Sequence, residues 1–277
     1  MKENNILEKI FHFKSKEIEE RKNIRSVKTL EEKPLFSRQN RSLAQAIQSK
    51  GHTGIIAEYK TRSPSMGMIN GNADLKQITQ GYLNAGASGL SILTDAHFFG
   101  GSLENLEMAK KANHAPILQK DFIMDTYQIT EAKAYGADAI LLIAAMLSKD
   151  EILKLSSFAH TLGLEILLEI HQKEELDKIN DQIQLVGINN RNLKDFSVNQ
   201  DHSINLVHSI PEPFVKIAES GIDSPYQAFN LLNNGFDGLL IGGEFMKHPK
   251  PDESCRDFID QLKDYMETDK ETQTKKQ

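Results

Sequence analysis

An acid and a base stand two positions apart where a short apolar segment of the chain ends. Residues 55–57 are apolar, and Glu58, Tyr59 and Lys60 follow them. Successive side chains of a β-strand point to opposite faces, so Glu58 and Lys60 would share one face of a strand formed here. Two charges on the inner face of a buried strand cost several kcal/mol unless pairing, water or a substrate compensates. The pair therefore indicates a site of proton transfer.

Polar residues end later apolar segments in the same way. They are Lys120, Glu169, Asn189 with Arg191, and Glu219. If those segments are parallel strands, these groups converge with Glu58 and Lys60 on one rim, where protons can be donated and accepted at separate points. The competing interpretation is that some of them form ion pairs that close the end of a barrel, and it is strongest for Glu219.

Glu165 stands at the beginning of its apolar segment instead of the end. In a barrel of parallel strands, charged residues at that end contribute to stability and not to catalysis. We therefore expect no catalytic role for Glu165.

The spacing of the apolar segments predicts the fold that would bring the polar residues together. The segments begin near Ile55, Leu90, Pro116, Ala139, Leu164, Leu185, Phe214 and Gly238. Each interval of about 20 to 35 residues holds one helix and two loops, which predicts an α/β protein with a (β/α)8 TIM barrel. An open doubly wound sheet is the alternative, but its usual G-x-G-x-x-G loop is missing from the sequence, as is a Walker loop.

Three parts of the chain are expected from these patterns. Residues 1–50 form a helical extension that packs on the barrel, with an apolar stripe through Leu7, Ile10 and Ile18 and a second helix that Ser42 caps. Residues 51–266 form the barrel. The polar residues 267–277 are expected to be a disordered tail.

Small residues after the last two strands predict a phosphate site. Ser220 and Gly221 follow one strand and Gly242 and Gly243 follow the next, and Ser63 would lie near them in the ring. Glycines admit close approach of a ligand to backbone N–H groups, and phosphate sites of such barrels use these two loops with a short helix N-terminus. Ordinary turn glycines are the alternative. Residues 66–72 contain two further glycines and predict a mobile loop that closes over bound substrate.

Aromatic and histidine residues supply a weaker signal. Phe99, Phe122 and Leu193 could receive a flat ring at the same rim, although residues of these types belong to the core equally often. The histidines lack metal-binding spacing such as H-E-x-x-H, and we interpret His97, His114 and His171 as surface or loop residues.

Composition narrows the class of protein. The chain has 277 residues, with 33 basic against 39 acidic residues and a net charge of −6, so electrostatic binding of nucleic acid is not expected. The single Cys255 excludes an intrachain disulfide and a cysteine-based zinc site. The first residues contain no apolar signal region, and no apolar run reaches membrane-spanning length. We expect a cytoplasmic enzyme or binding protein without a membrane partner.

The motifs together resemble the indole-3-glycerol-phosphate synthase family of tryptophan biosynthesis. The resemblance runs from the first helix to about residue 250, and its specific segments are residues 56–60 with 63–65, 90–94, 120–123, 187–191 and 218–222. It implies a (β/α)8 barrel and a decarboxylating lyase. The reaction would close the ring of 1-(2-carboxyphenylamino)-1-deoxyribulose 5-phosphate and release carbon dioxide and water. The resemblance implies no cofactor and no metal, and sequence does not show other pathway enzymes as partners.

The resemblance also implies a role for each matching residue. Lys120 would be the general acid that activates the sugar carbonyl, supported by Glu169 and Asn189, while Glu58 and Lys60 would handle dehydration and substrate placement. Glu219 is counted with the catalytic groups. Arg191 and Lys60 suit the substrate carboxylate, the two serine–glycine loops with Ser63 suit the phosphate, and Phe99, Phe122 and Leu193 suit the ring. Gly243 departs from the family pattern, where a side chain that can touch the phosphate is common.

Two other functions remain open at this point. One is another phosphate-binding barrel enzyme, either a sugar-phosphate isomerase or a Schiff-base aldolase with Lys60 or Lys120 as nucleophile. The other is a noncatalytic protein that binds a phosphorylated metabolite. Which of Glu58 and Glu169 removes a proton from the substrate, and the oligomeric state, also remain open, because distances decide both.

Overall fold

Parallel strands close into a barrel at the centre of the protein. The computed structural model describes residues 6–64, 66–191 and 197–274. Its barrel consists of β1 (Ile55–Tyr59), β4 (Gly89–Leu93), β5 (Ile117–Lys120), β6 (Ala139–Ile143), β7 (Glu165–Ile170), β8 (Leu185–Asn189), β9 (Val215–Glu219) and β10 (Gly238–Ile241). Neighbours are parallel in every pair, and β1 pairs with both β4 and β10 to complete the ring. The predicted TIM barrel and all eight predicted strands are confirmed.

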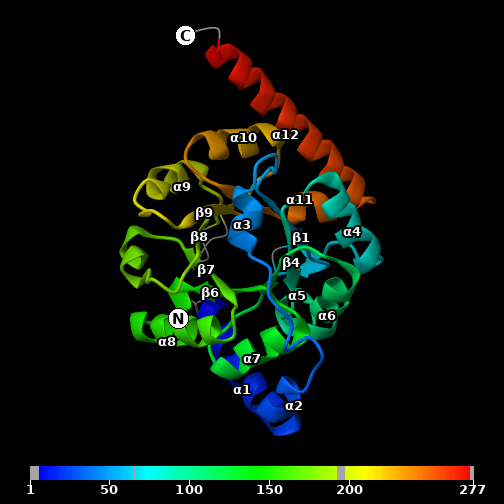
Figure 1. Ribbon diagram of the computed structural model, residues 1–277, viewed down its shortest axis with the longest axis vertical. Coiled ribbons are helices and arrows are strands. Elements are labelled where there is room, and N and C mark those ends of the chain that lie inside the picture. Colours follow the sequence, from blue (N-terminus) through cyan, green and yellow to red (C-terminus); the bar gives the residue numbers. More distant parts are fainter. Residues whose placement is uncertain (1–5, 65, 192–196, 275–277) are drawn as a thin grey trace, which may run out of the picture.

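Helices surround the barrel (Figure 1). The longer ones are α4 (Leu75–Ala85), α6 (Leu103–Ala112), α7 (Thr126–Tyr135), α8 (Lys149–Thr161), α9 (Gln200–Val207), α10 (Pro225–Asn233) and α12 (Pro251–Thr274). The connection from β7 to β8 differs, because it contains only the 3₁₀ segment η2 (Lys173–Lys178). Gly86 and Gly136 end α4 and α7 at φ 108° and 97°, values that suit glycine.

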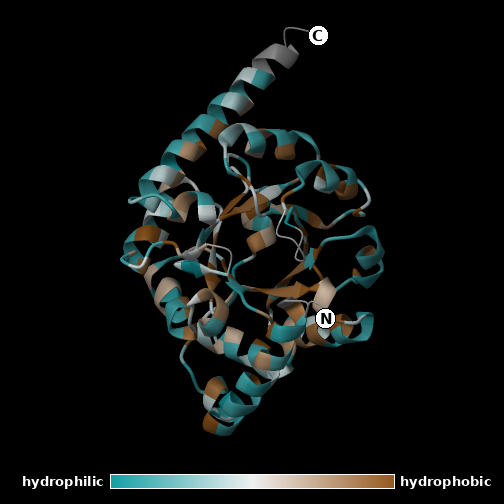
Figure 2. Cartoon of the chain, turned by 180° about the vertical axis from the view of Figure 1, so that it is seen from behind, coloured by the Kyte–Doolittle hydropathy of each residue, from teal (hydrophilic) through white to brown (hydrophobic). Residues whose placement is uncertain are grey.

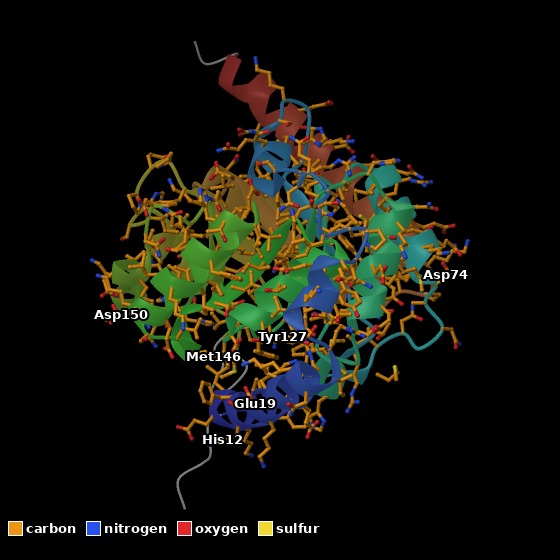
Figure 3. The ribbon with its side chains drawn as sticks, turned by 60° about the horizontal axis from the view of Figure 1, so that its bottom comes forward. His12, Glu19, Asp74, Tyr127, Met146 and Asp150 are labelled. Carbon is orange, nitrogen blue, oxygen red and sulfur yellow. The ribbon has the colours of Figure 1, made fainter. Side chains whose placement is uncertain are left out.

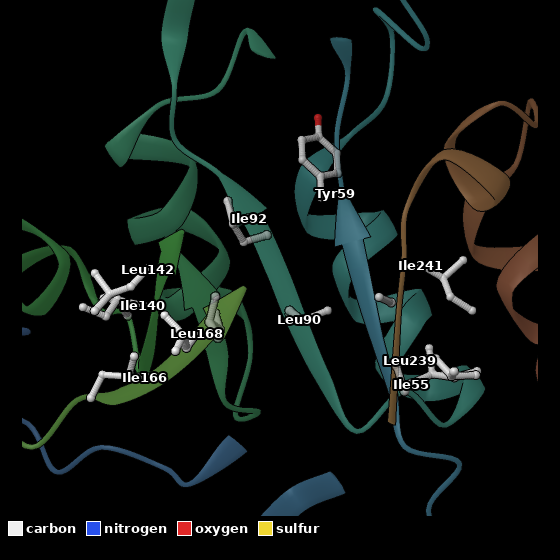
Figure 4. Close-up of a cluster of buried hydrophobic side chains, with 14 of the residues drawn as sticks. Ile55, Tyr59, Leu90, Ile92, Ile140, Leu142, Ile166, Leu168, Leu239 and Ile241 are labelled. Carbon is white, nitrogen blue, oxygen red and sulfur yellow. The ribbon is translucent and has the colours of Figure 1, made fainter. Parts of the chain in front are cut away.

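Alternation along each strand separates an inner from an outer layer of apolar side chains. On β1, Ile55 and Ala57 pack in the outer cluster between strands and helices, whereas Ile56 packs in the barrel interior. Figure 4 shows the outer cluster, with Leu90 and Ile92 of β4 near Tyr59. The strands are mostly hydrophobic, while the outer helices carry hydrophilic residues as well as hydrophobic ones (Figure 2). The same alternation places Glu58 on the inner layer.

The helices of the N-terminal extension pack against both ends of the barrel. It contains α1 (Ile6–Ile24), α2 (Val27–Glu31) and α3 (Leu43–Gln48), which Ser42 caps as predicted. Two buried residues of α3, Leu43 and Ile47, join the interior cluster. α1 lies at the opposite end of the barrel, where His12 and Glu19 are labelled in Figure 3 below Tyr127 of α7. The Tyr127 hydroxyl donates to the carbonyl oxygens of Arg21 and Arg25, 3.0 and 2.8 Å away.

Two segments differ from the expectations. The short helix α2, which was not predicted, lies between the first and second predicted helices. α12 continues to Thr274, so most of the segment expected to be a disordered tail is helical. Glutamate, lysine and glutamine favour helix, and a helix that is already formed extends at little cost, so low hydrophobicity alone does not end it. Residues 275–277 lie outside the described residues. No helix in the described part of the chain is long and apolar enough to cross a membrane.

Glu165 joins α3 to the first residue of β7. Its carboxylate accepts from the Ser42 hydroxyl at 2.5 Å and from the backbone N–H groups of Leu43 and Ala44 at 2.7 and 3.0 Å. We predict that Glu165→Ala lowers the free energy of unfolding by about 2 kcal/mol, because three donors lose their acceptor. Urea denaturation measures the change. Glu174→Ala, at an exposed position of η2, is the control. Equal stability of both variants would contradict the assignment.

Candidate active site

A cavity of about 460 Å³ lies at the ends of the strands where the polar residues gather. The predicted site residues that line it are Glu58, Lys60, Ser63, Phe99, Lys120, Phe122, Glu169, Asn189, Arg191, Glu219, Ser220, Gly221, Gly242 and Gly243. Leu193, which was predicted with them, lies outside the described residues. The convergence predicted from strand ends is therefore present in the fold.

Ion pairs and hydrogen bonds organise the charged groups in the cavity. Lys60 Nζ lies 2.8 Å from Glu58 Oε1, so the two side chains meet at the end of β1, with Lys60 directly after its last residue. Lys120 Nζ donates to Glu219 and lies 3.4 Å from Glu169 Oε2. Asn189 Nδ2 donates to Glu169 Oε1 at 3.2 Å. The result is a connected network in which one ammonium faces two carboxylates.

Burial and neighbouring charges shift the pKa values of Glu58, Glu169 and Glu219 in different directions. Burial alone would raise the pKa of each. For Glu58 it is outweighed by Lys60 and Lys120, and for Glu169 by Lys120 and then His171, so both pKa values fall. For Glu219 burial, with the like charges of Glu169 and Glu58, outweighs the attraction of Lys120 and raises the pKa to about 7. Glu58 and Glu169 are therefore ionised at neutral pH, while Glu219 exchanges a proton there.

Lys120 remains protonated in this environment. Burial acts to lower its pKa, but the carboxylates of Glu219, Glu169 and Glu58 together raise it. A lysine that attacks a carbonyl as a nucleophile needs the opposite shift, because only the neutral amine reacts. The electrostatics of Lys120 thus favour proton donation over Schiff-base chemistry.

The three histidines interpreted as surface or loop residues lie at such positions, but His171, in the loop after β7, also approaches the charged network. His97 and His114 are exposed, as predicted. The His171 side chain is only 12% exposed, and its Nε2 lies 3.5 Å from Glu169 Oε1. The position two residues after Glu169 puts both side chains on the same face of the chain as β7 ends, which is the signal that could have revealed it.

The small residues after β9 and β10 line the cavity together, as predicted for a phosphate site. We call Ser220, Gly221, Gly242 and Gly243 the cup. Ser220 and Gly221 both have positive φ, at 67° and 63°, and their carbonyl oxygens accept from Asn190 Nδ2 and Gln200 Nε2 at 2.7 Å each. Gly243 begins the short helix α11 (Gly243–Met246). The side chains of Asp223, Glu244 and Lys247 also line the cavity here and were not predicted. Phosphate binding at this cup stays a prediction.

Two aromatic rings, those of Phe99 and Phe122, line the cavity together with the charged groups, and we call this pair the aromatic wall. The rings of Phe99 and Phe122 lie 6.0 Å apart between centroids at 43° to each other. Phe99 ends the short helix α5 (Ala96–Phe99), and Phe122 follows β5 by two residues. Leu7 and Ile10 of α1 line the cavity as well. Both belong to the apolar stripe seen in the sequence, but a stripe does not tell which end of the barrel its helix covers.

The predicted mobile loop forms a small hairpin. β2 (Arg62–Ser63) and β3 (Gly67–Met68) are antiparallel, and the backbone N–H groups of Ile69 and Asn70 donate to the carbonyl oxygen of Thr61 at 2.8 and 3.3 Å. Met66, between the two strands, lines the cavity. Closure of residues 66–72 over a substrate stays a prediction.

The described residues contain no group of three or more histidine, cysteine, aspartate or glutamate residues arranged to hold a metal ion. The cavity itself brings proton donors and acceptors together with small residues.

Comparison with known proteins identifies close relatives over nearly the whole chain. The family model described as "Indole-3-glycerol phosphate synthase" matches residues 7–258. An indole-3-glycerol phosphate synthase of Bacteroides thetaiotaomicron is 46% identical over 254 residues, which are 92% of this chain and 97% of that protein. One of Acinetobacter baumannii is 39% identical, over 91% and 94% of the two chains. A solved 3-hexulose-6-phosphate synthase from Salmonella typhimurium has a TM-score of 0.59 at 12% identity, covering 76% of this chain and 98% of its own, and shows the fold alone.

Gly242 and Gly243 differ in the space that surrounds them. A Cβ at Gly242 would lie 2.7 Å from Glu58 Oε1, whereas a Cβ at Gly243 has nothing within 4 Å. We predict that Gly242→Ala lowers turnover roughly 10²-fold by displacing the Glu58 carboxylate. Gly243→Ala is the matched control and is expected to change turnover by less than about twofold, since it displaces nothing. Steady-state kinetics of both variants measure the difference, and equal losses would contradict it.

The raised pKa of Glu219 makes stability depend on pH. Folding raises this pKa from 4.5 to about 7, so the native state binds more protons than the unfolded state between those values. The contribution of Glu219 to stability is therefore complete below the unfolded pKa and is lost as pH rises to about 7. We predict that Glu219→Gln removes this part of the pH dependence, measured by urea unfolding at intervals from pH 4.5 to 7.5. Parallel curves for the wild type and the variant would refute it.

Proposed function

The chain belongs to the indole-3-glycerol phosphate synthase family, and we propose that its cavity closes the indole ring of 1-(2-carboxyphenylamino)-1-deoxyribulose 5-phosphate. The enzyme is a decarboxylating lyase of tryptophan biosynthesis, and its product is indole-3-glycerol phosphate. The observation that carries the assignment of roles is the protonated Lys120, held by buried carboxylates at the mouth of the barrel.

Ring closure requires a proton at the sugar carbonyl oxygen. The aromatic carbon that bears the carboxylate attacks the carbonyl carbon, a carbon–carbon bond forms, and the oxygen becomes a hydroxyl group. Lys120 supplies the proton, because its pKa is raised and it is charged at neutral pH. Glu169 and Asn189, which are hydrogen-bonded to each other, stabilise the positive charge that develops on the substrate.

Decarboxylation follows from the change of geometry at the attacked ring carbon. That carbon becomes tetrahedral, the bond to the carboxylate breaks, and its electron pair restores the aromatic ring as carbon dioxide leaves. Arg191 and Lys60 line the cavity and are the cations suited to orient the carboxylate. Too firm a grip would oppose its loss, because binding the ground state more tightly than the transition state slows the reaction.

Dehydration requires an acid and a base on the ring-closed intermediate. The hydroxyl leaves as water after protonation, and a base removes the proton from the neighbouring ring carbon. Glu58 and Glu169 are the candidates for the base because both have lowered pKa values. Lys60, 2.8 Å from Glu58, is placed to protonate the leaving group beside the first of them. Glu219, with its raised pKa, suits proton exchange with Lys120 better than proton removal from carbon.

The remaining site residues hold the two ends of the substrate. We assign the phosphate to Ser63 and the cup of Ser220, Gly221, Gly242 and Gly243, where backbone N–H groups can be approached closely. The aromatic wall of Phe99 and Phe122 suits the carboxyphenyl ring. We also propose a cytoplasmic location and a free small-molecule substrate, with no nucleic acid as partner, in keeping with the acidic net charge of −6.

The two competing functions are less well supported. A Schiff-base aldolase needs a neutral lysine, and the environment of Lys120 favours the charged form. A noncatalytic binding protein needs no set of buried acids and bases beside its phosphate cup. Borohydride reduction in the presence of a ketose phosphate separates the aldolase, since only an imine is trapped as a stable adduct.

The general-acid role of Lys120 has a direct test. We predict that Lys120→Ala lowers kcat at least about 10²-fold, the scale of a lost general acid, while the folded structure is retained. Absorbance-monitored indole formation from the carboxyphenylamino substrate measures turnover, and circular dichroism checks the fold. Lys76→Ala on the exposed face of α4 is the control and should leave kcat unchanged. Near-normal turnover of the Lys120 variant would disprove the assignment.

A further inference from the structure

Lys14 is a fully buried lysine that the proposed reaction does not use. It lies on α1 and its side chain is 0% exposed. Its Nζ lies 2.9 Å from Asp95 Oδ2, 2.9 Å from Asp121 Oδ1 and 3.0 Å from Glu17 Oε2. Because burying an ammonium costs several kcal/mol, its position between two barrel loops requires a compensating role.

The two aspartates that contact Lys14 hold the backbone of the aromatic wall. Asp95 Oδ1 accepts from the backbone N–H groups of Phe98 and Phe99 at 2.6 and 3.1 Å, which caps α5. Asp121 Oδ1 accepts from the backbone N–H of Phe122 at 2.8 Å, and its Oδ2 accepts from the Thr94 hydroxyl at 2.5 Å. One ammonium therefore joins the two carboxylates that fix the two rings facing the cavity.

Removal of this ammonium would leave the two aspartates in mutual repulsion. Both are buried and both contact the same nitrogen atom, so their negative charges are close neighbours at a buried position where solvent screens them little. Burial acts to raise the pKa of Asp121, but Lys14 and Thr94 keep it below its usual value. Without Lys14, repulsion would separate the loops after β4 and β5 and change the spacing of Phe99 and Phe122.

We propose that Lys14 is a positioning residue that sets the spacing of Phe99 and Phe122 and so fits the aromatic wall to the carboxyphenyl ring of the substrate. α1, which lies outside the barrel repeat, would then determine the affinity for the carboxyphenyl ring through the charge of Lys14. This inference rests on the proposed function, because it assumes that the wall receives the ring.

The test compares two buried lysines. Lys14→Met removes the charge at similar length, and we expect KM for the carboxyphenylamino substrate to rise about tenfold with kcat changed less than about threefold. The matched control is Lys110→Met. Lys110 is also buried and lies 2.6 Å from the buried Asp138, but neither residue lines the cavity. Both variants lose stability, and only the first is expected to change KM.

Hydrogen exchange gives a second readout that does not depend on activity. The backbone amides of Phe98, Phe99 and Phe122 should exchange faster in Lys14→Met and at the wild-type rate in Lys110→Met. If Lys14→Met does not fold, Asp95→Asn takes its place, because the amide still caps α5 but loses the ionic attraction to Lys14. For Asp95→Asn we then expect faster amide exchange at Phe98 and Phe99 and an elevated KM.

Three outcomes decide between the proposals. An unchanged KM and unchanged amide exchange in the Lys14 or Asp95 variant overturn the positioning role. Equal KM increases in Lys14→Met and Lys110→Met also overturn it, since general destabilisation then explains both. Phe122→Ala tests the wall itself: if its KM is normal, the ring-binding part of the proposed function fails, whatever the behaviour of Lys14.

Discussion

The buried ion network around Lys120 is the interaction on which the site depends. In this network the carboxylates of Glu58, Glu169 and Glu219 face the ammonium groups of Lys60 and Lys120, and their imbalance gives each carboxylate its protonation state. Glu58 and Glu169 are ionised because lysines face them, while Glu219 has a raised pKa. The barrel maintains the imbalance, since these residues come from different parallel strands that end at one mouth. Acid and base functions thereby coexist within a single cluster.

The fold and most of the site could be predicted because both depend on short-range patterns. Alternation along β1 placed Glu58 and Lys60 on one face, and repeated polar strand ends placed Lys120, Glu169 and Glu219 beside them. Parallel closure turned these local features into one cavity. The family resemblance supplied the chemistry, and the comparisons confirm the family.

The contributions that sequence patterns missed depend on long-range placement. The stripe containing Ile10 predicted a helix, but only the fold shows that this helix walls the cavity and buries Lys14 against Asp95 and Asp121. His171 was interpreted as a surface or loop residue, and only the fold shows that this loop position brings its ring near Glu169. The helical end of α12 was missed for a different reason. The polar composition of this segment indicates that its side chains are exposed, but it does not show whether the backbone is helical.

The N-terminal extension packs against both ends of the barrel, and this has a consequence for how the chain folds. α1 precedes in the chain the loops after β4 and β5 that its Lys14 contacts. Ser42 and Glu165 are 123 positions apart, so the contact that joins α3 to β7 forms only after the chain has been synthesised through residue 165. Contacts between such distant residues slow folding, and the early helices are exposed to premature association during that delay.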